Sequence, residues 1–340
     1  MKSNHANRRT PIRRRAMLLS VLALLVIAAF AVGDHFERMS KIQTRGVIAE
    51  NIGRFRRIEV QGATYVEKTG ITTILVLGVD KTGSYGSYGA RQGGQADFLT
   101  VLAIDHAGKT IYPLQIDRDT MTEIEIYGIL GNNVGPRIMQ LCLAHGYGKT
   151  ETENNHNTVN AVRGLLQDIP IDYYMTLNLN AIGVLNNALG GVTVTLDFDF
   201  TAFDPQMTEG KTLRLNAEQA QIYTRFRLEV GDGTNESRMR RQREYLRIAG
   251  EMLTEKAAAD PNFAGQLFDE LGGDMTTNMS RGQLINELNT TYHYAVQPME
   301  TFSGRHVVGE TGFMEFYPEE EDIVAWVLRV FYRLDANHPA

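Results

Sequence analysis

Thr72-Thr73-Ile74-Leu75-Val76-Leu77-Gly78-Val79-Asp80 is a continuous apolar and β-branched run that ends in a carboxylate. A run that is apolar at successive positions predicts a strand buried on both faces of a sheet. Two more such runs follow at residues 97–105 and 110–116, and the turn at 105–109 predicts that they form a hairpin. The segment Asp117-Arg118-Asp119-Thr120 therefore follows directly from the end of the third strand.

The rest of the chain mixes helical and strand-like patterns. We expect helices at 135–145, 156–168 and 181–189, the last one stopped by Gly190-Gly191, strands at 171–178 and 192–200, and an amphipathic helix near 322–332. This mixture predicts an α/β fold with a single mixed β-sheet flanked by helices. We place the domain at residues 71–258 and expect residues 259–340 to complete it.

Five arginines lie between residues 225 and 242 in two regular spacings. The run 221–227 has strand character, which predicts that Arg225 and Arg227 share one face. Residues 236–256 predict a helix, on which Arg238, Arg241, Gln242 and Tyr245 form one stripe. Converging guanidinium groups repel one another unless an anion lies among them, and arginine binds phosphate oxygens bidentately, so we expect a pyrophosphate here. Two unrelated groups of solvated arginines are the alternative.

Composition excludes several classes of function. The net charge of −6 argues against nucleic acid as the main partner. The single cysteine, Cys142, allows no disulfide within the chain and no cysteine metal site. The eight histidines show no spacing typical of a zinc site.

The N-terminus predicts the compartment. Arginines precede an apolar run at residues 16–32, which as a helix is about 25 Å long, close to the ~30 Å of a bilayer core. We expect a cytoplasmic tail at 1–15, a single transmembrane anchor at 16–33, a spacer at 34–70 and an extracytoplasmic domain at the cell membrane. A signal peptide cleaved near Ala29-Phe30-Ala31 is the alternative.

Eight short motifs, taken together and in this order, resemble the LytR–CpsA–Psr family of bacterial cell-wall glycopolymer ligases. They are Leu77-Gly78-Val79-Asp80, Ala96-Asp97-Phe98-Leu99, Asp117-Arg118-Asp119-Thr120, Ile169-Pro170-Ile171-Asp172-Tyr173-Tyr174, Ala188-Leu189-Gly190-Gly191-Val192, Leu215-Asn216-Ala217-Glu218-Gln219-Ala220, Arg225-Phe226-Arg227 and Arg238-Met239-Arg240-Arg241-Gln242.

The resemblance implies an apolar channel for a polyprenyl chain beside the sheet. It also implies transfer of a phosphorylated glycan, such as teichoic acid or capsule, from a polyprenyl pyrophosphate to a peptidoglycan hydroxyl. Asp80 and Asp97 match the acidic pair that binds Mg²⁺. The pyrophosphate-binding set matches Arg118, Arg225, Arg227, Arg238, Arg241 and Gln242, and the catalytic residues match Asp97, Arg118 and Asp119. The base that accepts the acceptor proton is left open between Asp80, Asp97 and Asp119.

The chain departs from the family pattern at two places beside these motifs. Gln95-Ala96 replaces the usual Arg-Ser, so one arginine is missing, and Arg91 in the preceding loop is a candidate replacement. Gln115-Ile116-Asp117 replaces the usual Ser-Ile-Pro and adds a carboxylate. A hydrolase of the lipid pyrophosphate and a non-catalytic envelope regulator or lipid-binding scaffold remain alternative functions.

Overall fold

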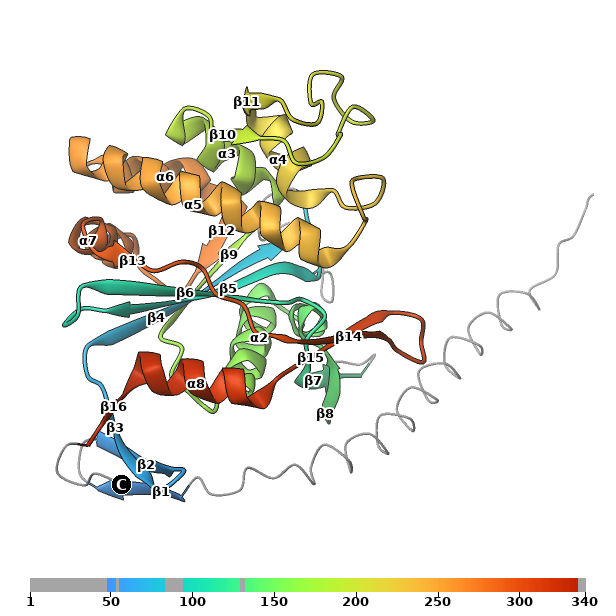
Figure 1. Ribbon diagram of the computed structural model, residues 1–340. Coiled ribbons are helices and arrows are strands. Elements are labelled where there is room, and N and C mark those ends of the chain that lie inside the picture. The colour runs from blue at the N-terminus through green and yellow to red at the C-terminus, as the bar shows by residue number, and fades with distance from the viewer. Residues whose placement is uncertain (1–47, 53–54, 83–93, 129–131, 336–340) are drawn as a thin grey trace, which may run out of the picture.

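A six-stranded mixed sheet runs through the centre of the computed structural model, which describes residues 48–52, 55–82, 94–128 and 132–335 (Figure 1). The strand order is β12 (Met275–Thr277), β9 (Tyr173–Leu177), β4 (Ile71–Val79), β5 (Ala96–Asp105), β6 (Thr110–Ile116) and β13 (Ala295–Val296). Strands β4, β5 and β6 form an antiparallel meander, whereas β9 is parallel to β4 and β13 to β6. The predicted mixed sheet and its hairpin are confirmed.

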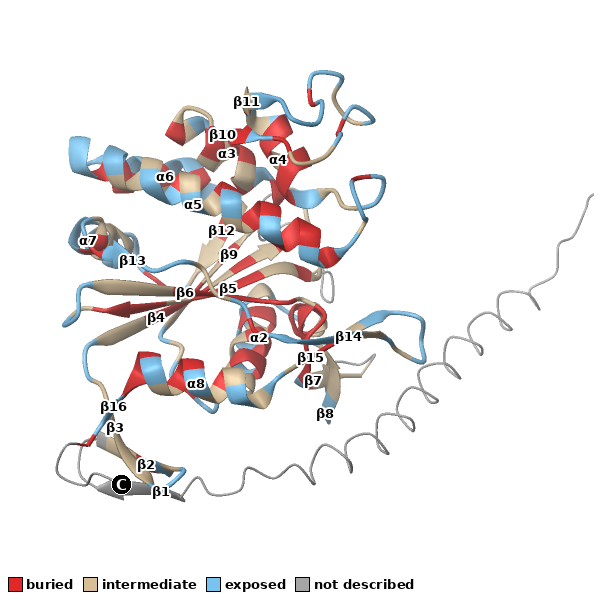
Figure 2. Cartoon of the chain, viewed as in Figure 1, coloured by how far each residue is buried: buried red, intermediate tan, exposed pale blue. Residues whose placement is uncertain are grey.

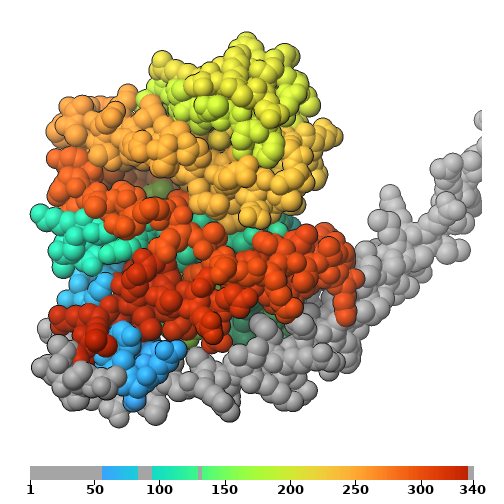
Figure 3. Space-filling model, in the orientation of Figure 1, coloured from blue at the N-terminus to red at the C-terminus, as the bar shows by residue number. Residues whose placement is uncertain are grey.

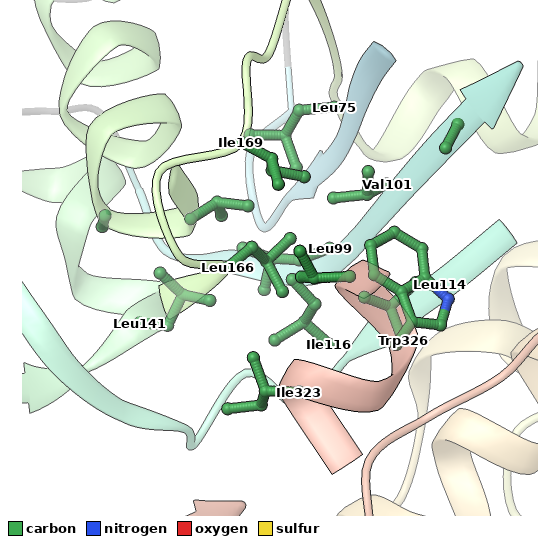
Figure 4. Packing of buried hydrophobic residues seen from close by; sticks show 14 of the residues in the cluster. Leu75, Leu99, Val101, Leu114, Ile116, Leu141, Leu166, Ile169, Ile323 and Trp326 are labelled. Carbon is green, nitrogen blue, oxygen red and sulfur yellow. The ribbon is translucent and has the colours of Figure 1, made fainter. Parts of the chain in front are cut away.

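One face of the sheet is covered by α2 (Glu151–Leu165) and α8 (Glu320–Phe331). Side chains alternate across a strand, so Leu75 and Leu77 point to this face. They join the largest apolar cluster together with Leu99, Leu114 and Trp326 of α8 (Figure 4). Burial of these side chains is the main source of stability for the sheet.

The opposite face carries a layer of helices: α3 (Leu179–Leu189), α4 (Ala217–Arg225), α5 (Asn235–Ala259), α6 (Phe263–Leu271) and α7 (Arg281–Thr291). The long helix α5 crosses above the sheet, and its buried residues are concentrated toward its N-terminal end (Figure 2). That end therefore lies where side chains of α5 can meet the ends of the sheet strands.

Smaller sheets and 3-10 turns complete the fold. One sheet contains β1 (Ile48–Ile52), β2 (Phe55–Val60), β3 (Ala63–Glu67) and β16 (Tyr332–Leu334). Three antiparallel strand pairs are β7 (Met121–Tyr127) with β8 (Asn133–Gln140), β10 (Thr193–Thr195) with β11 (Thr212–Arg214), and β14 (Gly304–Val308) with β15 (Met314–Pro318). The 3-10 turns are η1 (Leu141–Gly146) and η2 (Gly272–Asp274). The orange-red and red residues that follow α7 run across the face seen in Figure 3, below α5.

Three sequence predictions differ from the structure. The strand predicted at 192–200 is limited to β10. Residues 221–225 are the last turns of α4, because the capping box between Asn216 and Gln219 starts a helix that buries Ile222 and Tyr223. Residues 135–140 belong to strand β8, which pairs with β7. Gly135, with a φ of 92°, and Pro136 both disfavour a helix here.

The spacer predicted at 34–70 is a sheet in its described part, where β2 and β3 pair and Ile58 is buried in the main cluster. The tail at 1–15, the anchor at 16–33 and Arg91 lie outside the described residues. Within the described ranges, no helix has the length and apolar character needed to cross a bilayer.

Candidate functional site

Asp97 lies at a β-bulge near the start of β5. Gly78 pairs with Phe98 and Val79 with Ala96, so Asp97 is the extra residue on its strand. A bulge bends the strand and turns the extra side chain out of the regular alternation. The carboxylate of Asp97 contacts two arginines from distant parts of the chain, Arg118 and Arg238, the second at 3.4 Å.

Arg118 follows β6 and is the most connected cation of this site. Its guanidinium group donates to Asp97 and to Oε1 of Gln95, lies 3.1 Å from Sγ of Cys142, and is 3.3 Å from Oδ1 of Asp119. Burial by itself would lower the pKa of Arg118, but Cys142 and the two carboxylates outweigh it and raise the pKa. Arg118 therefore stays charged although its side chain is 15% exposed.

Arg238 reaches the same carboxylate from α5. Its side chain is 4% exposed, and its Nη2 donates to Oδ1 of Asn235 at 2.7 Å. Burial lowers the pKa of Arg238, and Asp97 opposes this shift. Arg118 and Arg238 thus share the carboxylate of Asp97, and guanidinium groups can bind phosphate oxygens bidentately.

Asp119 is a buried carboxylate beside these arginines. Its pKa is raised by burial and by Asp117, while Arg118, Arg227 and Arg238 act in the opposite direction. Its Oδ2 atom has no hydrogen-bond partner among the described residues. A carboxylate with a raised pKa and a free oxygen is suited to accept a proton.

Asp117 forms a second layer behind this cluster. Its Oδ1 accepts hydrogen bonds from Nδ2 of Asn235 at 2.8 Å and from the backbone N–H of Asp119 at 2.9 Å. Its Oδ2 lies 2.9 Å from Nε2 of His306 on β14. The motifs did not predict His306 and Asn235, because both residues come from segments outside them. The added carboxylate at Asp117 was the one signal that a partner was needed.

The stripe predicted on α5 is buried, and its members have different partners. Arg238 joins the cluster, whereas Arg241 donates to the backbone carbonyls of Tyr223 and Phe226. Gln242 donates to the carbonyl of Thr224 at 3.1 Å and accepts from Gln115. Arg241 and Gln242 thus fasten the end of α4.

The two arginines at the end of α4 and just after it, Arg225 and Arg227, differ in exposure. Arg225 is exposed and lies over the ring of Phe226 at 5.5 Å. Arg227 is half-buried and close enough to act on the pKa values of Asp119 and Arg238. The structure therefore brings Arg227, and not Arg225, to the edge of the cluster.

Asp80 follows the end of β4 and Asp97 lies near the start of the antiparallel strand β5, so both lie at the same edge of the sheet. Oδ1 of Asp80 accepts from the backbone N–H of Gln95 at 2.8 Å, and its side chain is exposed. The described residues contain no group of three or more metal-binding side chains. Mg²⁺ is commonly held by one or two carboxylates together with phosphate oxygens. Both oxygens of Asp97 contact arginines, whereas the side chain of Asp80 is exposed.

The model of the LytR_cpsA_psr family matches residues 37–317. A polyisoprenyl-teichoic acid–peptidoglycan teichoic acid transferase, TagU, from Halalkalibacterium halodurans is 27% identical over 289 residues, which are 84% of this chain and 87% of that protein. Two crystal structures share the fold. Protein gbs0355 from Streptococcus agalactiae has a TM-score of 0.63 at 24% identity, over 77% of this chain and 87% of that one. TagV from B. subtilis has a TM-score of 0.59 at 21% identity, over 77% and 96%.

Proposed function

Because this chain belongs to the LytR_cpsA_psr family, we propose that it transfers a phosphorylated glycopolymer from a polyprenyl-pyrophosphate carrier to a peptidoglycan hydroxyl. The relative from H. halodurans, named as a transferase of teichoic acid to peptidoglycan, supports this reaction. The observation that carries the proposal is the meeting of half-buried Arg118 and buried Arg238 on the single carboxylate of Asp97.

The reaction makes one phosphodiester and breaks one phosphoanhydride. The acceptor oxygen attacks the phosphorus that carries the glycan, and polyprenyl phosphate leaves with the electron pair of the broken P–O bond. Phosphoryl transfer depends mainly on positioning and on neutralising charge. Arg118 and Arg238 supply that charge, and Asp97 orients both of them before the substrate binds.

The remaining arginines differ in how directly they contact the substrate in this proposal. Arg227 completes the pyrophosphate site from the segment that follows α4, and Arg225 binds more peripheral oxygens of the substrate. Arg241 and Gln242 act indirectly, because they fix the carbonyls from which that segment departs.

Asp119 is the proposed base that takes the proton of the acceptor hydroxyl. Its raised pKa brings it closer to the working range of a general base than an ordinary aspartate. Asp97 is less suited to this role, since both of its oxygens are engaged by arginines.

Asp80 and Asp97 are the proposed ligands of Mg²⁺. When bound, the ion would neutralise charge on the phosphate oxygens. The residues of the chain hold the phosphates and move the proton.

The lipid and membrane parts of the proposal rest on different features. We place the polyprenyl chain in an apolar channel along the helix layer, because α5 carries Arg238 at one end and packs over apolar side chains of α3, α4 and α6 beyond it. The basic segment and apolar run at residues 8–33 support an anchor that keeps the domain at the outer side of the cell membrane.

The test uses the full chain in detergent with Mg²⁺, a polyprenyl-pyrophosphoryl glycan labelled in its sugar, and peptidoglycan. We expect label to become covalently attached to peptidoglycan. Arg118→Ala should lower the rate at least ~100-fold, since it removes donors to the transition state. The matched control is Arg281→Ala, which removes an exposed arginine paired with Asp269.

Two outcomes would contradict the proposal. Release of free phosphorylated glycan without attachment would show hydrolysis of the lipid carrier. Full transfer by the Arg118→Ala chain would show that the site lies elsewhere.

A further inference from the structure

Asp117 places a buried negative charge behind a site that must bind an anion. Its side chain is 4% exposed, and it lies two residues from Asp119. Unit charges a few ångströms apart still interact by a few kcal/mol at the effective dielectric constant of about 20 that suits proteins. An uncompensated Asp117 would therefore weaken the binding of a pyrophosphate.

His306 is the residue that meets this carboxylate, and the hairpin β14–β15 holds it there. The backbone N–H of Phe316 donates to the carbonyl of Asp119 at 2.8 Å, which ties the hairpin to the segment after β6. The imidazole of His306 packs on the ring of Phe316, with centroids 4.5 Å apart. Its Nε2 lies 2.9 Å from Oδ2 of Asp117.

The charged groups around His306 are mostly acidic. Asp117 and Asp119 face it from the segment after β6, and Glu236 faces it from α5. On its own hairpin, Arg305 lies over the ring of Tyr317, and Glu315 accepts from the hydroxyl of Tyr317. The hydrogen bond to Asp117 is the largest cause of a raised pKa for His306, so the imidazolium form is favoured.

We propose that His306 is a positioning residue of the pyrophosphate site, which neutralises Asp117 and fixes the chain of contacts Asp117–Asn235–Arg238. Asn235 links Asp117 to Arg238, because its Nδ2 donates to Asp117 while its Oδ1 accepts from Arg238. This inference rests on the proposed function and adds a residue from the C-terminal hairpin to it.

The inference predicts a pH dependence of binding. Below the pKa of His306 the imidazolium balances Asp117, and affinity for the anion is full. As the pH rises through that pKa the imidazole becomes neutral, Asp117 is left uncompensated, and affinity falls. A pyrophosphate esterified at both ends has no second ionisation near neutral pH, so the ligand itself does not cause the change.

The experiment measures the dissociation constant of a short-chain prenyl-pyrophosphoryl-N-acetylglucosamine for the full chain in detergent between pH 5.5 and 8.5. We expect affinity to fall about tenfold across this range for the unaltered chain. His306→Gln keeps a donor to Asp117 but loses the charge, so it should bind about tenfold more weakly at pH 5.5 and show no pH dependence.

Two further variants separate charge from folding. Asp117→Asn removes the carboxylate, so it should bind at least as tightly as the unaltered chain at all pH values. The double variant Asp117→Asn/His306→Gln should recover the affinity that His306→Gln loses, which a folding defect would not do. The matched control is His293→Gln, an exposed histidine near β13, which pairs with the first residues of β6, far from Asp117.

Equal affinity and equal pH dependence in His306→Gln and the unaltered chain would overturn the inference alone. Failure of the unaltered chain to bind the probe at any pH would overturn the proposed function and the inference with it.

Discussion

At the scale of the residue, neighbouring arginines of one helix stripe have different physical roles. Arg238 is buried next to Asp97 and is placed to meet an anion. Arg241 is 1% exposed, donates to two backbone carbonyls, and lies 5.2 Å from the ring of Phe200. The spacing in the sequence predicted that both lie on one stripe of a helix, and α5 is a helix over these residues. The spacing did not distinguish their partners, which depend on where α4 ends.

Replacing Arg241 should therefore change stability more than chemistry. Arg241→Met leaves the carbonyls of Tyr223 and Phe226 without donors, and we expect a loss of about 2–4 kcal/mol in the free energy of unfolding. Arg241→Lys should lose less, because the ammonium group can still donate. Urea denaturation followed by far-UV circular dichroism measures both changes.

Arg240→Met is the control for that experiment, because Arg240 is 57% exposed and its ion pair with Asp197 should contribute under about 1 kcal/mol. A stable Arg241→Met chain that no longer binds the pyrophosphate probe would instead identify Arg241 as a direct ligand.

At the scale of the element, the residues of the site lie at or next to the ends of the sheet strands β4, β5 and β6. β4 ends before Asp80, β5 begins with the bulge at Asp97, and β6 delivers Arg118 and Asp119. The apolar runs predicted these strands closely, since a buried strand is specified by its own residues. The strand β8 was missed although Gly135 and Pro136 disfavour a helix there, because its partner β7 had not been predicted. The helical end of α4 was missed because the capping box that starts it lies before residue 221.

A substitution at Gly94 tests whether Asp80 takes part in the proposed metal site. It has a φ of 74°, and a Cβ atom there would lie 2.8 Å from Oδ1 of Asp80. We expect Gly94→Ala to displace that carboxylate and to raise the Mg²⁺ concentration needed for half-maximal transfer by about tenfold, which corresponds to roughly 1.4 kcal/mol. Titration of the transfer assay with Mg²⁺ measures this.

Gly62→Ala is the matched control, since Gly62 has a φ of 83° and open space around its Cβ position. Both variants carry the strain of a left-handed residue, of the order of 1 kcal/mol. Equal Mg²⁺ requirements in the two variants would remove Asp80 from the proposed metal site.

At the scale of the whole molecule, the C-terminal residues close the fold and reach the site. The family model ends at residue 317, and α8 starts at Glu320, yet α8 contributes Ile323, Trp326 and Val330 to the largest apolar cluster. The hairpin β14–β15 before it brings His306 to Asp117. The amphipathic pattern at 322–332 predicted the helix. The face of the sheet that α8 covers was not predictable, because it depends on the path of the chain between the sheet and α8.

The last prediction concerns this closing helix. Trp326 is 3% exposed and packs in the cluster with Leu99 and Leu114 of the sheet (Figure 4). Trp326→Ala removes a large side chain from a packed interior, and we expect a loss of about 3–5 kcal/mol in the free energy of unfolding. Far-UV circular dichroism in urea is the measurement, because the variant lacks the only tryptophan of the chain. Leu334→Ala, at a side chain that is 55% exposed, should change stability by under about 0.5 kcal/mol. A Trp326→Ala chain as stable as this control would mean that α8 is a separable appendage of the sheet.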